Sequence, residues 1–155
     1  MAGAPALTKI LDALAERLRA MPQVHVFSDR DGSEPLMREE LPAIVINDLG
    51  VDVTERPELG NAAQVHTATI QIDFYENFEV WSTITARHRE MIAQAMAIIH
   101  ADWSLGGMLQ ELNPIGISKA DDVLADQGAA VLEIEIKFLT AFGDWTTGIG
   151  QAGTF

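Results

Sequence analysis

The regular alternation of apolar and polar residues between positions 65 and 75 constrains the fold of this chain most strongly. Its apolar positions are Ala68, Ile70, Ile72 and Phe74, and the polar positions between them are Thr67, Thr69, Gln71 and Asp73. A period of two places each set on its own face of an extended strand. The pattern therefore predicts a sheet with one buried face, whose other face meets solvent or a second subunit.

A second strand is expected just before this one, at residues 41–47, where the chain is almost wholly apolar. Pro42 stands at its start, where a missing N–H is tolerated. Residues 47–64 between the two strands are polar, acidic and rich in turn formers, so they predict a β-ribbon or long loop at the sheet edge. We take four of its charged residues as a candidate subunit or tube interface: Asp52, Glu55, Arg56 and Glu58.

Two amphipathic helices are predicted from apolar residues three and four positions apart. The first spans 6–21, with Leu7, Ile10, Leu11, Leu14 and Leu18 on one stripe and Pro22 ending it. The second spans about 82–101, with Ser82 as its N-cap and a stripe that includes His88. His88 is therefore expected to be partly buried and hydrogen-bonded.

The remaining strands are expected around Ile115 and Ile117 and over residues 132–138, with an acidic turn at 120–128. The order of elements predicts an α+β fold: a mainly antiparallel or mixed β-sheet with two helices packed on one face, plus the protruding ribbon. We expect one domain over residues 1–142. The glycine-rich segment 143–155 reads as a flexible C-terminal arm that carries little of the core.

Charge limits the function classes. Ten Lys and Arg against 23 Asp and Glu give a net charge of −13, which argues against binding nucleic acid through its phosphates. The excess of acid is explained either by solubility or by a surface that DNA must pass without sticking. The chain has no cysteine, which excludes disulfides and thiolate chemistry. No apolar run approaches the roughly 18 residues of a membrane span, and we expect no secretory signal and no membrane role.

A search for catalytic motifs gives no positive result. The chain has no phosphate-binding loop, and its histidines, His25, His66, His88 and His100, include no pair at the i, i+4 spacing of a helical metal site. Asp121, Asp122 and Asp126 do not match a calcium loop. We therefore expect no metal, no cofactor and no catalytic residue.

One arrangement of carboxylates stays open to two interpretations. Glu133 and Glu135 share a strand face about 7 Å apart, which suits either a solvated face or acid–base chemistry. Joined by His25 or His66, they would suit a small hydrolase or isomerase. With Asp73 they would instead form an acidic surface.

Further candidate contact residues come from the second helix and the C-terminal segment. Arg87 and Arg89 form the only basic cluster of the sequence with His88 between them, and acids of a neighbouring molecule are suitable partners for them. Trp145, like Trp81 and Trp103, flanks an element, where aromatic side chains either anchor contacts or fill the core.

The order of elements, with particular segments, resembles the tail terminator proteins of long-tailed bacteriophages, the family of the lambda minor tail protein U. The resemblance rests on Leu-Pro-Ala-Ile at 41–44, on residues 69–74 and 98–102, and on the closing strand 132–138, and it covers roughly residues 6–142. Related neck and tail-completion proteins share a similar order. These families have no catalytic signature, so none is transferred.

The resemblance implies a non-enzymatic virion protein. It would form a homo-hexameric ring at the head-proximal end of the tail, cap the tail tube, stop its polymerisation and join the head–tail connector. Assembly would take place in the host cytoplasm, and DNA would pass through the ring without specific binding. Asp73, Glu133 and Glu135 are candidates for an acidic bore.

Overall fold

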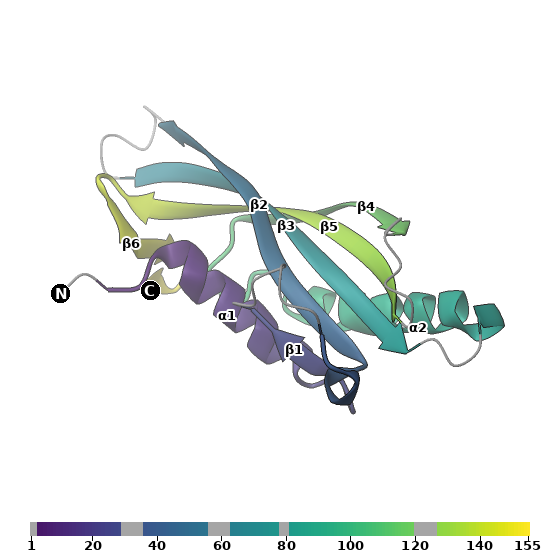
Figure 1. Cartoon of the computed structure of the whole chain (residues 1–155). Helices are drawn as coiled ribbons and strands as arrows, with labels where there is room; N and C mark the ends of the chain where they lie inside the picture. The colour runs from purple at the N-terminus through teal and green to yellow at the C-terminus, as the bar shows by residue number, and fades with distance from the viewer. Residues whose placement is uncertain (1–2, 29–35, 56–62, 78–80, 120–126) are drawn as a thin grey trace.

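The computed structural model describes residues 3–28, 36–55, 63–77, 81–119 and 127–155. Within these residues it contains two α-helices, a short 3₁₀ helix and seven strands (Figure 1). In chain order they are α1 (Ala6–Leu18), β1 (His25–Phe27), the 3₁₀ helix Arg38–Glu40, β2 (Ala43–Glu55), β3 (Ala63–Asn77), α2 (Trp81–Ala101), β4 (Glu111–Lys119), β5 (Gln127–Ala141), β6 (Asp144–Gly150) and β7 (Gly153–Thr154).

All seven strands join one mixed sheet in the order β1-β2-β3-β5-β6-β7. β1 and β2 are parallel, and the other pairs are antiparallel. β3 and β5 pair over their full length, from Ala63 opposite Ala141 to Asn77 opposite Gln127. The edge of β5 that faces away from β3 pairs with two strands. β4 pairs with Ala130–Lys137, and β6 pairs near Leu139. The predicted α+β class is confirmed.

Both helices cover the same face of the sheet, as the sequence predicted (Figure 1). α1 contacts β1, β2 and β6, whereas α2 contacts β3 and β5. The buried residues include the predicted stripe of β3 and the even-numbered residues of β5: Ala68, Ile70, Ile72, Phe74, Ala130, Leu132, Ile134, Ile136 and Phe138. The opposite face of the sheet carries the odd-numbered, mostly polar residues, so we call it the outer face.

The ribbon expected at 47–64 is largely a continuation of the sheet. β2 and β3 stay paired out to Glu55 opposite Gln64, while β3 also pairs with β5 on its other side. The register shifts between Asp48 and Gly50, and this bulge reverses which residues of β2 face the helices. Val51 and Val53 consequently lie opposite Ala68 and His66, and Asp52 turns to the outer face.

The prediction that residues 143–155 form an arm outside the domain is wrong, because these residues join the sheet. β6 pairs with β5, and β7 folds back on β6. Phe155 packs against the core, and its backbone N–H and C=O both pair with Gly148. A Cβ at Gly148 would clash with the Phe155 ring. Glycine lets the ring cover the strand, so the segment contributes to the core that it was expected to leave.

Helix ends differ slightly from the prediction. α1 ends at Leu18 instead of residue 21, because Ala20 and Met21 donate backbone hydrogen bonds to Arg17 and Leu18, three residues back. α2 begins at Trp81, one residue before the predicted cap. Gln127 and Gly128 belong to β5, while residues 120–126 of the predicted turn lie outside the described part of the chain.

Candidate assembly surfaces and an aromatic pocket

The outer face brings the three candidate bore acids onto one surface. Glu133 on β5 lies opposite Gln71 on β3, and Glu135 lies opposite Thr69. Asp73 follows Gln71 on the same face of β3, so it is the diagonal neighbour of Glu133. Lys137, two residues beyond Glu135, forms an ion pair with Glu111 of β4 at 3.3 Å. Acids therefore dominate the centre of the outer face.

Asp73 is the most buried of these acids, at 8% exposure. Its strand neighbours are Val45 of β2 and Val131 of β5. Val45 belongs to a small apolar cluster with Leu36 and Ala43, which covers this end of the outer face. Burial raises the pKa of Asp73, and the hydrogen bond that Gln71 Nε2 donates at 2.8 Å opposes that rise.

Besides the short terminal strands β1 and β7, the long strands β2 and β4 have open edges. Within the described residues, β2 beyond Val45 pairs only with β3, and β4 pairs only with β5. Both edges expose aliphatic side chains: Leu49, Val51 and Val53 on β2, and Ile115 and Ile117 on β4, the last two at 54% and 63%. Exposed aliphatic side chains on an unpaired edge are characteristic of an association surface.

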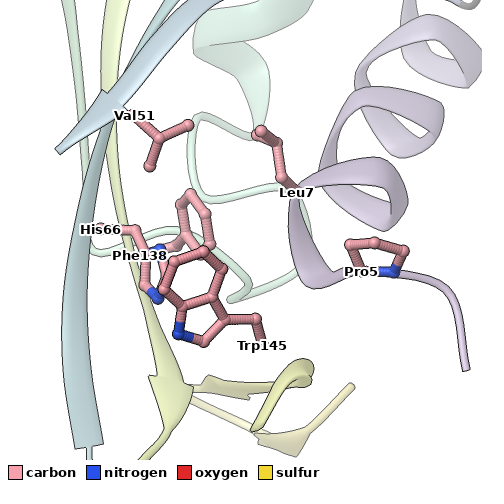
Figure 2. Close-up of a pocket in the computed structure, with 6 residues that line it drawn as sticks. All are labelled: Pro5, Leu7, Val51, His66, Phe138 and Trp145. Atoms are coloured by element: carbon pink, nitrogen blue, oxygen red, sulfur yellow. The ribbon is translucent and has the colours of Figure 1, made fainter. Parts of the chain in front are cut away.

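An aromatic pocket lies where the start of α1 meets the β2 end of the sheet. We call this cavity the aromatic pocket. It has a volume of about 160 Å³ and is lined by Pro5, Leu7, Val51, His66, Phe138 and Trp145. Figure 2 shows the rings of His66, Phe138 and Trp145 gathered together, with Leu7 and Pro5 across the space and Val51 above. No lining side chain other than His66 is titratable.

His66 is held by three contacts. Its ring stacks on Phe138 with centroids 4.8 Å apart and meets the Trp145 ring edge-on at 5.2 Å. Its Nε2 is hydrogen-bonded to Thr140 Oγ1 at 2.8 Å, with the donor set by the tautomer. Burial lowers the pKa of His66, so the ring is neutral at pH 7.

Trp145 forms part of this pocket and is also half exposed, at 53%. Its indole N–H donates a hydrogen bond to Gln64 Oε1 at 2.9 Å, which ties β6 to the beginning of β3. The prediction of Trp145 as a contact residue is neither confirmed nor contradicted by this position, because it fills the fold and remains accessible.

The residues of the alternative enzyme do not meet. His66 faces the helices, whereas Glu133 and Glu135 lie on the outer face of the same sheet. His25 is exposed on β1, with β2 and β3 between it and β5. The proposed acid–base set is therefore divided between two faces and an edge.

The remaining candidate residues are scattered. Arg87 is exposed on α2 and forms ion pairs with Glu90 at 3.2 Å and Glu76 at 3.5 Å, and Arg89 is exposed nearby. Asp52 is exposed on β2, and Glu55 ends that strand. Arg56 and Glu58 lie outside the described residues, as do Asp121, Asp122 and Asp126.

Histidine positions agree with the sequence in part. His88 is buried on α2, as its place in the apolar stripe predicted, and His100 is exposed. Across the part of the chain that the structure describes, no group of three or more His, Asp or Glu residues is arranged to hold a metal ion. Its helices also include none that is long and apolar enough to cross a membrane.

Sequence reasoning missed the aromatic pocket. Its residues come from five separate segments, and only Trp145 carried a local signal. The bulge in β2 turns Val51 toward the pocket, and the alternation of residues 47–55 does not predict this bulge. No protein-family model matches this chain, and no curated protein sequence matches it.

Proposed function

We propose that this protein is a structural virion protein, a phage tail terminator that acts as a homo-hexameric ring. One observation carries the proposal: within the described residues, the long strands β2 and β4 each have an open edge that exposes aliphatic side chains. The two surfaces are different, so contact between them is head-to-tail. Head-to-tail contacts form a ring when the rotation between copies closes.

The outer face supports a ring around DNA. Both helices cover one face of the sheet, so joining edge to edge would leave the outer face along one wall of the ring. Asp73, Glu133 and Glu135 would then line the bore. Like charge would keep DNA from binding while it passes.

The terminator role and the ring size follow from the sequence resemblance. That resemblance supplies the tail tube protein and the head–tail connector as partners, the head-proximal end of the tail as the location, and six as the number of copies. A neck or tail-completion protein is the related alternative, and it predicts binding to the connector without capping of the tube.

Two measurements test the proposal. Light scattering over a hundredfold range of protein concentration should reveal a species of six copies, and negative-stain microscopy should show rings. Because terminators can close into rings only on the tube, the protein should also be mixed with tubes assembled from the tube protein of the same genome. Rings at tube ends and shorter tubes are expected. A monomer in solution together with bare, unrestricted tubes would exclude the terminator.

A further inference from the structure

We propose that the aromatic pocket is the binding site for Ile117 from strand β4 of a second copy of this chain. The inference rests on the proposed ring and adds the contact that closes it. Because the pocket would bind a side chain of the neighbouring copy, it would determine which surfaces of the two copies meet. The two strand edges would lie beside it.

The pocket suits one aliphatic side chain. Its volume is about 160 Å³, and its walls are the rings of Phe138, Trp145 and neutral His66 together with Leu7, Pro5 and Val51. An apolar cavity of roughly 150 Å³ holds benzene. The four side-chain carbons of isoleucine are smaller than that ring, so Ile117 fits without displacing the walls.

Ile117 is available to bind. It lies opposite Leu132 in the β4–β5 pair, on the side of the sheet that carries the helices, yet it is 63% exposed. Neither helix therefore covers it. Transferring a large aliphatic side chain from water into an apolar pocket contributes roughly 25 cal/mol per Å² of surface removed.

The two edges match in length, and residues of opposite charge lie on β2 and on α2. β4 has nine residues, and the open part of β2 runs over ten, from 46 to 55. The β2 edge exposes Asp48 and Asp52, whereas Arg89 is exposed on α2, which packs on β5, the strand that pairs with β4. None of the three forms an ion pair with another described residue. Opposite charges on two different surfaces of one chain favour a second copy over an unrelated partner.

Cysteine cross-linking tests the contact, because the chain has no native cysteine. We would mix two single variants, Val51→Cys and Ile117→Cys, with one carrying a mass tag, under mild oxidation. The expected product is a mixed dimer with one tag. The matched control pairs Val51→Cys with Gln94→Cys, which is exposed on α2, and should give little product.

A binding measurement complements the cross-link. Ile117→Asp should weaken self-association at least tenfold, and Met37→Asp, a change at an equally exposed residue away from both edges, should not. Circular dichroism of both variants checks that they fold. Because Leu7→Trp fills the pocket from α1, it should weaken association as Ile117→Asp does.

The outcomes separate this inference from the proposed function. Rings that form while Val51 and Ile117 fail to cross-link, and while Ile117→Asp has no effect, would overturn the pocket contact and leave the ring intact. A mixed dimer that extends into filaments instead of closing would support the contact and exclude the terminator. Absence of cross-linking, together with a monomer in solution and bare, unrestricted tubes, would overturn both.

Discussion

At the scale of single residues, the buried titratable groups Asp73 and His66 lie on opposite faces of the sheet and respond to acid in opposite ways. Asp73 is buried beside Val45, and His66 is buried under Trp145. Burial disfavours the charged form of each, so the pKa of the acid rises and the pKa of the base falls. Each shift links folding to pH with its own sign.

We expect Asp73→Asn to raise the free energy of unfolding at pH 7. The folded pKa of Asp73 lies above the ordinary value of 3.8, so ionised Asp73 opposes folding at neutral pH. That opposition fades as pH falls through the raised pKa, and the advantage of the variant should shrink accordingly. Urea unfolding at several pH values measures this.

The matched control for Asp73 is Glu135→Gln, which removes one negative charge from the same outer face. Its side chain is half-buried rather than buried. Because the chain carries a net charge of −13, both variants relieve general repulsion equally. If Glu135→Gln stabilises as much as Asp73→Asn, burial of Asp73 is not the cause.

His66 gives the opposite pH dependence. Below the unfolded pKa of 6.5 the unfolded chain takes up a proton that buried His66 resists, so stability is lost as pH falls from 6.5 toward the lowered folded pKa. His66→Gln, which keeps a polar partner for Thr140, should lose less stability between pH 7 and pH 5. Thermal melts at these two pH values check the difference, and His100→Gln at an exposed site should keep the wild-type slope.

At the scale of elements, the C-terminal pair β6 and β7 is tied to the rest of the domain by its pairing with β5 and by Phe155. Its ring packs on the core against Gly148. Phe155→Ala should lower the free energy of unfolding by about 1–2 kcal/mol. This is less than the 3–5 kcal/mol typical of fully buried phenylalanine, because Phe155 is only partly buried.

The chain offers a matched control for Phe155 in Phe142, which is 50% exposed between β5 and β6. Phe142→Ala should change stability by no more than about 0.5 kcal/mol. Chemical denaturation of the two variants in parallel gives both values. Equal, small effects would restore the expectation that residues 143–155 are an arm without a structural role.

At the scale of the whole molecule, the proposed ring makes the outer face a bore, and reversing its charge should create DNA binding. Glu133→Lys with Glu135→Lys places two cations beside Lys137 on that face. We expect retention of double-stranded DNA that weakens steeply with salt, since release of counterions drives such binding. Gel shifts at several salt concentrations measure it.

The control for the bore is an equal change of charge elsewhere. Asp12→Lys with Glu16→Lys places two cations on the exposed side of α1. In a ring, this side would lie away from the bore. DNA retention should therefore be weak or absent, and equal retention by both double variants would contradict a bore lined by the outer face.

The sequence by itself determined both helices, the central strands β3 and β5, and the side of the sheet that becomes the core. The alternation at 65–75 and the stripe through His88 predicted β3, the burial of Ile70 and the burial of His88. Such patterns report local periodicity, and burial of one face follows from it directly. The same patterns placed Asp73 on the polar face of β3 and placed Glu133 and Glu135 on the polar face of β5, and the β3–β5 register brings the two faces together.

Tertiary structure alone decided the parts that depend on contacts between distant segments. Residues 143–155 join the sheet because β5 offers an edge and Gly148 leaves space for Phe155. The aromatic pocket exists because α1, β2, β3, β5 and β6 converge, and a one-residue bulge turns Val51 toward it. Periodicity contains no information about such convergence, because the free energy of these contacts is gained only once the chain has folded.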